Sequence, residues 1–263
     1  MKVRNSAPRI GLARVVSKVG YCSRSRATEL IRAGRVSLSG KTCWDPETPV
    51  VGGAGQVKID GKIIAVREKL YYMLNKPRGV ITTASDEKGR ETVYSLLGGD
   101  LAEPTSPSTE TAWIAPVGRL DKASEGLLLL TNDTKWAALV TEPETHVEKT
   151  YHVQVGVVAD DALLQWVIRG VTAKDGEKLQ AKRVNRLRAG EKTSWLEIVL
   201  DEGKNRHIRR MMEAVGVEVL RLVRVAIGPL QLGDLAKGKC RALTADEKRM
   251  LDRALLESGL IAK

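Results

Sequence analysis

The hydrophobic positions at the start of the chain follow a helical spacing and then change to alternation. From Leu12 to Val19 they recur at i, i+3, i+4 and i+7. A second helical run begins after Ser23, a good N-cap residue, and ends at Gly34. From residue 35 to residue 59, short alternating runs are separated by Ser-Gly and Asp-Gly turns. This pattern predicts two short helices followed by a small β-ribbon.

Beyond residue 70 the pattern predicts both strands and helices. The uninterrupted run Leu127–Leu130 is typical of a strand buried on both faces. Thr244-Ala245-Asp246-Glu247 is a capping box that opens a C-terminal helix to about Glu257. Trp166 and Trp195 lie in apolar periodic contexts, so we expect both in the core. The remaining predicted strands are 70–75, 80–83, 148–155, 194–200 and 219–225. The remaining predicted helices are 91–97, a short one after Asn132-Asp133, 161–169 and about 205–215.

A polar loop runs directly into the buried leucine strand. It carries Asp121, and Gly118 and Gly126 bracket it, which lets the backbone turn sharply or approach a ligand. A carboxylate held by a core strand but reachable from solvent is a common catalytic arrangement. An ordinary surface loop, in which Asp121 pairs with Arg119 or Lys122, fits these residues as well.

Composition predicts a folded protein of a reducing compartment. The chain has 263 residues, of which 43% are hydrophobic, enough for a sizeable core. Cys22, Cys43 and Cys240 are odd in number and far apart, which favours neither a disulfide framework nor a zinc site. No apolar run approaches the length of a membrane span or of a signal peptide. We therefore expect a cytoplasmic protein without a membrane partner, a metal site or a cofactor.

Positive charge is concentrated in the first quarter of the chain. Residues 1–69 hold 14 Lys and Arg against 5 Asp and Glu, whereas residues 70–263 hold 29 against 27, for a net charge of +11. Counterion release favours a polyanionic partner for such a segment. Scattered solubilising lysines are the alternative, but arginine dominates the helical part, and guanidinium groups suit phosphate geometry.

The central loop also resembles a known motif. Gly118-Arg119-Leu120-Asp121, followed by Ser124-Glu125-Gly126 and the leucine run, is similar to the central motif of the ribosomal pseudouridine synthases of the small-subunit type. That family includes members that act on large-subunit RNA. Its motif contains the essential catalytic Asp, so the resemblance implies that Asp121 is the nucleophile. Asn75-Lys76-Pro77-Arg78-Gly79 and Ile227-Gly228-Pro229-Leu230 also recur in the family.

Two further site residues follow from the same resemblance. In the family, the Tyr at the position of Tyr151 lies against the target base, which makes Tyr151 a stacking residue and a candidate for proton transfer. By position in the third motif, Arg209 is the basic residue that forms an ion pair with Asp121. From the residues alone, a core tyrosine and a solvated arginine face are the alternatives. The motif cations that we expect at the RNA are Lys76, Arg78, Arg119 and Arg206, with a solvated turn as the alternative for the first two.

The first quarter resembles the S4 RNA-binding domain. The segments Gly20-Tyr21-Cys22-Ser23-Arg24-Ser25-Arg26 and Ile31-Arg32-Ala33-Gly34-Arg35-Val36 carry this similarity, although Ser25 stands where the domain usually has a second Arg. Structured RNA is met mostly through its shape and backbone, for which an arginine-bearing helix face is suited. The predicted RNA-binding residues are Arg14, Lys18, Arg24, Arg26, Arg32 and Arg35.

These resemblances imply an α+β protein of two domains. We expect a basic tail (1–8), a small S4-like RNA-binding domain (9–63), a linker (64–69) and a pseudouridine synthase catalytic domain (70–263) with a mixed, mostly antiparallel central sheet. Residues 98–113, rich in Ser, Thr, Glu and Pro, are predicted to be a mobile insertion.

The predicted activity is the site-specific isomerisation of uridine to pseudouridine in ribosomal RNA. Nothing is oxidised or consumed in this reaction, so no cofactor is expected. The expected partner is ribosomal RNA or a pre-ribosomal particle, and the expected state is a monomer. Asn205-Arg206 favours large-subunit over small-subunit RNA. A non-catalytic S4-type ribosome-binding protein is the alternative. A carboxylate hydrolase lacks a second well-placed acid, since Glu125 is the only carboxylate nearby.

Overall fold

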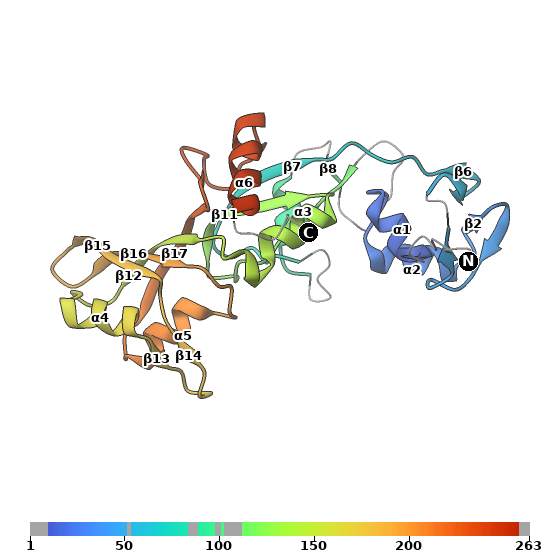
Figure 1. Ribbon diagram of the computed structural model, residues 1–263. Coiled ribbons are helices and arrows are strands. Elements are labelled where there is room, and N and C mark those ends of the chain that lie inside the picture. Colours follow the sequence, from blue (N-terminus) through green and yellow to red (C-terminus); the bar gives the residue numbers. More distant parts are fainter. Residues whose placement is uncertain (1–9, 52–53, 84–88, 98–100, 103–111, 258–263) are drawn as a thin grey trace, which may run out of the picture. The chain divides into compact units, whose positions relative to one another are not determined.

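The computed structural model (Figure 1) describes residues 10–51, 54–83, 89–97, 101–102 and 112–257. Contacts divide the chain into a first unit, residues 1–70, 97–115 and 131–134, and a second unit that holds the rest. The predicted basic tail lies outside the described residues, as do residues 98–100 and 103–111 of the predicted insertion. The described parts of that insertion include β8 (Leu101–Ala102) and β9 (Ala112–Trp113), which pair in parallel.

Two helices and a small sheet form the first unit, as the pattern predicts. In α2 the Ser23 hydroxyl accepts a hydrogen bond from the Arg26 amide at 3.1 Å, and the chain leaves the helix through Gly34 at a φ of +71°. The apolar faces of both helices pack into one core with the sheet. The elements are β1 (Ile10–Gly11), α1 (Leu12–Lys18), α2 (Arg24–Arg32), β2 (Val36–Leu38), β3 (Lys41–Cys43), β4 (Pro49–Val50), η1 (Ala54–Gln56), β5 (Val57–Ile59) and β6 (Lys62–Ile63).

The sheet of the first unit has the order β3-β2-β5-β6 with antiparallel neighbours, and β1 pairs with β4. Ile64 is 4% exposed within this core, and the Arg67 amide donates to the Val19 carbonyl at 3.2 Å. The first half of the predicted linker is therefore packed on the first unit, because Ile64 continues the apolar face of the sheet.

A nine-stranded mixed sheet organises the second unit. Its main path is β15-β16-β12-β17-β11-β7-β19, while β10 pairs with β11 and β18 with β17. The strand β11, predicted as the buried leucine run, is buried at all seven positions and runs parallel to β17, whereas β12 is antiparallel to both of its neighbours. The strands are β7 (Tyr71–Lys76), β10 (Ala115–Val117), β11 (Glu125–Thr131), β12 (Lys149–Val155), β15 (Arg183–Ala189), β16 (Ser194–Leu200), β17 (Val219–Ile227), β18 (Leu230–Gln231) and β19 (Cys240–Ala242).

Helices cover the sheet in two groups, each with its own core. The group of α4 and α5 packs with β12, β15 and β16, and the group of α3 and α6 packs with β7, β11 and β18, as Figure 1 shows. The remaining elements are η2 (Val93–Leu96), α3 (Thr134–Thr141), η3 (Pro143–Thr145), α4 (Asp161–Arg169), β13 (Val171–Thr172), β14 (Lys178–Leu179), α5 (His207–Ala214) and α6 (Ala245–Glu257).

One predicted helix of the second unit starts later than expected, and one core prediction is wrong. The helix predicted over about 205–215 begins only at His207, because Arg206 has left-handed backbone angles (φ 49°, ψ 32°). Trp166 is 54% exposed, since it lies on the outer side of α4 while Leu163 and Val167 face the core. Among the helices that the structure describes, none is both long and apolar enough to cross a membrane.

Candidate active site

The loop that carries Asp121 is held by its backbone, and the Asp121 side chain is left free. The Ser124 amide donates to the Asp121 carbonyl at 2.9 Å, the Thr82 hydroxyl to the Leu120 carbonyl at 2.8 Å, and the Gly79 amide to the Lys122 carbonyl at 2.8 Å. The Asp121 carboxylate makes no hydrogen bond or ion pair with any described residue. A rigid loop thus presents an available carboxylate.

Lys76 is a structural residue of this loop and does not meet RNA as predicted. Its side chain is 0% exposed. The ammonium donates to the carbonyls of Pro77 at 3.0 Å, Asp121 at 3.1 Å and Ser124 at 2.9 Å. Burial lowers the pKa of Lys76 to about 8, against the opposing charges of Asp121 and Glu125. The prediction failed because the strand β7 extends through Lys76 and turns this side chain inward.

Arg209 reaches the same loop but does not form the predicted ion pair. Its guanidinium donates to the Ala123 carbonyl at 3.0 Å and to the Val219 carbonyl at 3.4 Å, and no carboxylate of a described residue lies within ion-pair distance. Burial lowers the pKa of Arg209, as do Arg206 and Arg78, while the charge of Asp121 raises it. The guanidinium therefore acts on Asp121 only as a nearby charge, and it holds the loop through the carbonyl of Ala123.

A cavity of about 200 Å³ opens beside this loop. Asp121 and Arg119 line one side, and Tyr151 of β12 lines another. The structure thus brings together Asp121, Tyr151, Arg119 and Arg206 among the predicted site residues, whereas Arg209 and Arg78 are outside the lining. The other lining residues are Val117, Gly118, Leu120, Ser124, Val140, Thr141, Lys149, Leu200, Glu202, Gly203, Lys204, His207, Ile208, Leu222, Arg224 and Ile227.

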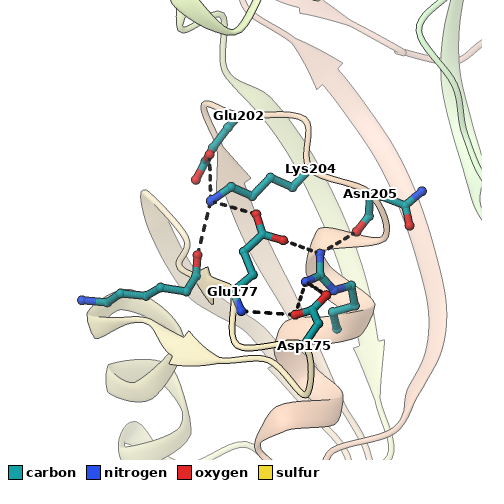
Figure 2. A network of polar contacts seen from close by, with 7 residues as sticks. Asp175, Glu177, Glu202, Lys204 and Asn205 are labelled. Carbon is teal, nitrogen blue, oxygen red and sulfur yellow. Dashed lines mark hydrogen bonds and ion pairs between the residues drawn. The ribbon is translucent and has the colours of Figure 1, made fainter.

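A network of ion pairs and hydrogen bonds holds Glu202, Lys204 and Asn205 in place (Figure 2), and the first two of these residues line the cavity. The Lys204 ammonium lies 3.1 Å from a Glu202 carboxylate oxygen and 3.6 Å from one of Glu177. The Arg210 guanidinium pairs with Asp175 and, at 2.8 Å, with Glu177, and it donates to the Asn205 carbonyl. Arg210 follows Arg209 on the short helix α5, but its side chain points to these acids and is not part of the cavity lining.

The cavity wall holds cations that were not predicted, among them Lys149 and Arg224. Lys149 precedes Tyr151 by two positions on β12, so both side chains lie on one face. Burial and, to a smaller extent, the charge of Arg224 lower the pKa of Lys149 to about 8, while the charge of Asp201 opposes both. Arg224 is 6% exposed, and its Nε donates to the Leu127 carbonyl at 2.7 Å. The sequence does contain a signal for Arg224. Alternation in β17 places its side chain on the same face as Leu222, and this would have predicted a buried arginine.

Glu125 has a structural role. Its side chain is 4% exposed and accepts hydrogen bonds from Arg221 at 3.1 Å and from Lys237 at 2.6 Å. Burial opposes its charge, but these two cations outweigh the burial and keep the pKa of Glu125 below its usual range. The acid is therefore held ionised in an ion-pair cluster, which leaves Asp121 and Glu202 as the acids that line the cavity.

The predicted RNA-binding residues of the first unit fall into two classes. Arg24, Arg26 and Arg35 pair with Glu47 at 3.4 Å, Glu29 at 2.7 Å and Asp60 at 2.6 Å. The other class, whose members pair with no acid among the described residues, consists of Arg14, Lys18 and Arg32. Arg14 and Arg32 are exposed, so the basic helix face keeps free charge.

Comparison with known proteins identifies the family. The model of the RNA pseudouridylate synthase family matches residues 70–214. The chain belongs to this family. It is therefore a pseudouridine synthase, an isomerase that acts on RNA, and the S4 domain model matches residues 10–55.

Named relatives of this pseudouridine synthase cover most of its length. A ribosomal large subunit pseudouridine synthase B of Bacillus subtilis (strain 168) is 36% identical over 94% of this chain and 97% of its own. The protein of the same name from Escherichia coli (strain K12) is 38% identical over 84% of this chain and 74% of its own. An uncharacterized RNA pseudouridine synthase of Rickettsia prowazekii is 33% identical over 93% of this chain and 97% of its own.

The fold has a solved counterpart. A crystal structure of a pseudouridylate synthase superposes with a TM-score of 0.62 over 92% of this chain and 99% of its own, at 24% identity. The expected α+β class, with an S4 domain at the N-terminus and a mixed, mostly antiparallel sheet after it, is confirmed.

Proposed function

We propose that this pseudouridine synthase isomerises a specific uridine of ribosomal RNA, with Asp121 as the essential carboxylate. The observation that carries the proposal is the contrast within one loop. Lys76 and Arg209 hold its carbonyls, while the Asp121 carboxylate has no partner among the described residues and lines a cavity with Tyr151. This is the arrangement expected of a preorganised nucleophile.

The reaction needs the bond from C1′ to N1 broken, the uracil turned and a bond from C1′ to C5 formed. An ionised Asp121 either attacks the substrate, at the sugar or the base, or removes a sugar proton. The nearby Arg209 charge favours the ionised carboxylate when RNA closes the cavity to water. Tyr151 stacks on the flipped base, and either Tyr151 or Asp121 accepts the C5 proton.

The first unit supplies affinity through its basic helix face, chiefly Arg14, Lys18 and Arg32, and the second selects the uridine. Large-subunit RNA is the favoured substrate, since the relatives from Bacillus subtilis and Escherichia coli are named for it. We propose further that the protein acts as a monomer in the cytoplasm, on ribosomal RNA or on an assembling particle.

Pseudouridine mapping of ribosomal RNA tests the activity and names the target. In cells that lack the protein, one site should be lost, and added wild-type protein should restore it. Asp121→Asn should fail to restore the site, although the purified variant should bind ribosomal RNA within about twofold of the wild type, because the substitution removes a charge without changing the shape of the cavity.

The matched control is Asp133→Asn, an acid of similar burial outside the cavity, which should restore the site. Restoration by Asp121→Asn would overturn the catalytic assignment. Loss of no ribosomal site would favour a non-catalytic ribosome-binding protein or another RNA.

A further inference from the structure

Lys149 and Arg224 form a pair of cations in the cavity wall without an acid to match them. The Lys149 ammonium makes no hydrogen bond or ion pair with a described residue. Arg224 is 94% buried and donates through Nε to Leu127, but its Nη2 is buried without a partner. A buried donor without a partner is unfavourable, because it has lost its hydrogen bonds to water. Both groups line the cavity, so a ligand in the cavity can satisfy them.

The two cations flank Tyr151 in the sheet. Lys149 lies two residues before Tyr151 on the same face of β12, and Arg224 is the residue of β17 opposite Tyr151. A base stacked on Tyr151 would therefore have the Lys149 ammonium on one side, along β12, and the Arg224 guanidinium on another, on the neighbouring strand β17. In the proposed function, which stacks the target base on Tyr151, these two cations are therefore next to the base.

The charges around the pair leave it unneutralised. Facing Lys149 are Arg224 from β17 and Asp201 from the end of β16. The same cavity is lined by the acids Asp121 and Glu202 and by the basic groups Arg119, Lys204, Arg206 and His207. Glu202 is occupied by Lys204, and burial lowers the pKa of His207, which keeps it neutral. The cavity is thus prepared for an anion.

We propose that Lys149 and Arg224 bind the uracil as it leaves C1′ and stabilise the negative charge that develops on its oxygens. The inference rests on the proposed function. When the bond from C1′ to N1 breaks, its electron pair stays with N1 and spreads onto O2 and O4. C1′ either bonds to the Asp121 carboxylate or becomes part of a double bond as C2′ loses a proton to it.

The same electron pair then forms the bond from C5 to C1′. The carboxylate leaves, or the proton returns to C2′. C5 loses its proton and N1 gains one, so that uridine and pseudouridine have the same atoms. Between these steps the uracil is an anion that must turn without escaping. Two donors aimed at charge that exists only after bond breaking favour the transition state over the bound substrate.

Single-turnover kinetics test the proposal on the RNA fragment that carries the mapped uridine. Lys149→Met should bind this RNA within about twofold of the wild type, while isomerisation at saturating protein should slow by about 10²–10³-fold, the usual effect of one donor in such a site. Lys149→Arg should recover at least about a tenth of the wild-type rate. The control Lys192→Met, at an exposed lysine between β15 and β16, should change neither quantity.

The pH profile adds a measurement that a merely structural role would not affect. The pKa of about 8 means that Lys149 is charged below that pH and neutral above it. The wild-type rate should therefore fall above about pH 8. Lys149→Arg should make that decline smaller, because a guanidinium stays charged. The part of the decline that remains belongs to Lys76, whose pKa is also about 8.

Three outcomes overturn the inference. The first is normal turnover by Lys149→Met. The second is weakened RNA binding with an unchanged saturating rate, which would place a phosphate at the pair. The third is a Lys149→Arg variant with normal RNA affinity whose rate declines at high pH as steeply as that of the wild type. A wild-type protein that isomerises no uridine would instead overturn the proposed function, and this inference with it.

Discussion

At the scale of single residues, the loop that carries Asp121 is held in place by side chains that donate hydrogen bonds to its backbone carbonyls. Lys76 and Arg209 together donate to the carbonyls of Asp121, Ala123 and Ser124. Charge-assisted hydrogen bonds of this kind are about twice as strong as neutral ones. The position of the Asp121 carboxylate is thus set by two cations from β7 and α5, elements distant from it in sequence.

Lys76→Met should lower both stability and activity. In the variant, three carbonyl oxygens lose their hydrogen-bond donor. This loss is partly offset because the variant does not have to bury a charged ammonium. We therefore expect the free energy of unfolding to fall by about 2 kcal/mol. Turnover should fall at least about tenfold, since the loop is no longer fixed. Urea denaturation and single-turnover assays measure the two effects. Lys122→Met, at an exposed lysine of the same loop, is the control and should change neither.

Gly126 is required by the close approach of two strands. Its φ is +101°, and a Cβ atom there would lie 2.2 Å from the Arg224 carbonyl oxygen. Gly126→Ala should therefore cost at least about 3 kcal/mol of unfolding free energy. Gly118→Ala separates backbone strain from this clash, because its φ is +73° but its Cβ would find Thr141 at 3.5 Å. That variant should lose only about 1 kcal/mol, and equal losses in thermal unfolding would contradict the argument.

At the scale of elements, local capping and pairing explain why the helices begin where they do. The capping box predicted before α6 forms, with the Thr244 amide donating to Glu247 at 2.8 Å and the Glu247 amide to the Thr244 hydroxyl at 3.2 Å. Glu247 also accepts two hydrogen bonds from Arg241 of β19, at 2.7 and 2.8 Å. One acid thus starts α6 and ties it to the edge strand of the sheet.

The stability contributed by Glu247 should depend on pH. The hydrogen bonds from Arg241 outweigh burial and lower the pKa of Glu247 to about 2. Because the folded pKa lies below the unfolded value of about 4.3, the contribution is fully present above that value and is lost as the pH falls toward 2. Glu247→Gln should cost about 1–2 kcal/mol at about pH 7 and less than half of that at about pH 3.

Urea denaturation at both pH values measures this difference. Asp246→Asn, which removes an exposed partner of Arg249, is the control and should cost less than about 0.5 kcal/mol at either pH. A loss for Glu247→Gln that is the same at both pH values would show that the charge of Glu247 contributes nothing.

At the scale of the whole molecule, the chain forms two units with separate cores, and the proposed function divides binding and chemistry between them. The excess positive charge of residues 1–69 belongs to the first, and the cavity with Asp121 belongs to the second. Electrostatic attraction to RNA is independent of sequence, whereas the choice of one uridine needs a shaped pocket. Affinity and turnover should therefore be separable by mutation.

A triple variant in which Arg14, Lys18 and Arg32 are each replaced by Gln should bind RNA more weakly and with a smaller salt dependence. Its turnover at saturating RNA should stay within about twofold of the wild-type value. For each phosphate that the variant no longer neutralises, the slope of log K against log[salt] should decrease in magnitude by about 0.7 to 0.9. The matched control replaces Arg24, Arg26 and Arg35, which already pair with acids, and should have a smaller effect. Filter binding over a salt series measures both. Equal slopes for the two triple variants would contradict the division.

The sequence by itself determined the local elements and the order of the motifs. The helices α1, α2 and α4, the strand β11 and the capping box of α6 were predicted because period and capping are properties of neighbouring residues. The placement of Asp121 just before a buried strand followed from the same local pattern, and the prediction of a catalytic role for it came from resemblance.

The tertiary structure decided which cations serve the loop and which face the cavity. Lys76 proved to be buried, Arg209 to hold a carbonyl, and Lys149 and Arg224 to line the cavity beside Tyr151. Alternation tells which residues share a face of a strand, but not what covers that face. Here the neighbours of β12 come from residues 194–200 and 219–227, so the surroundings of its side chains are set by pairings between distant segments, which no local pattern contains.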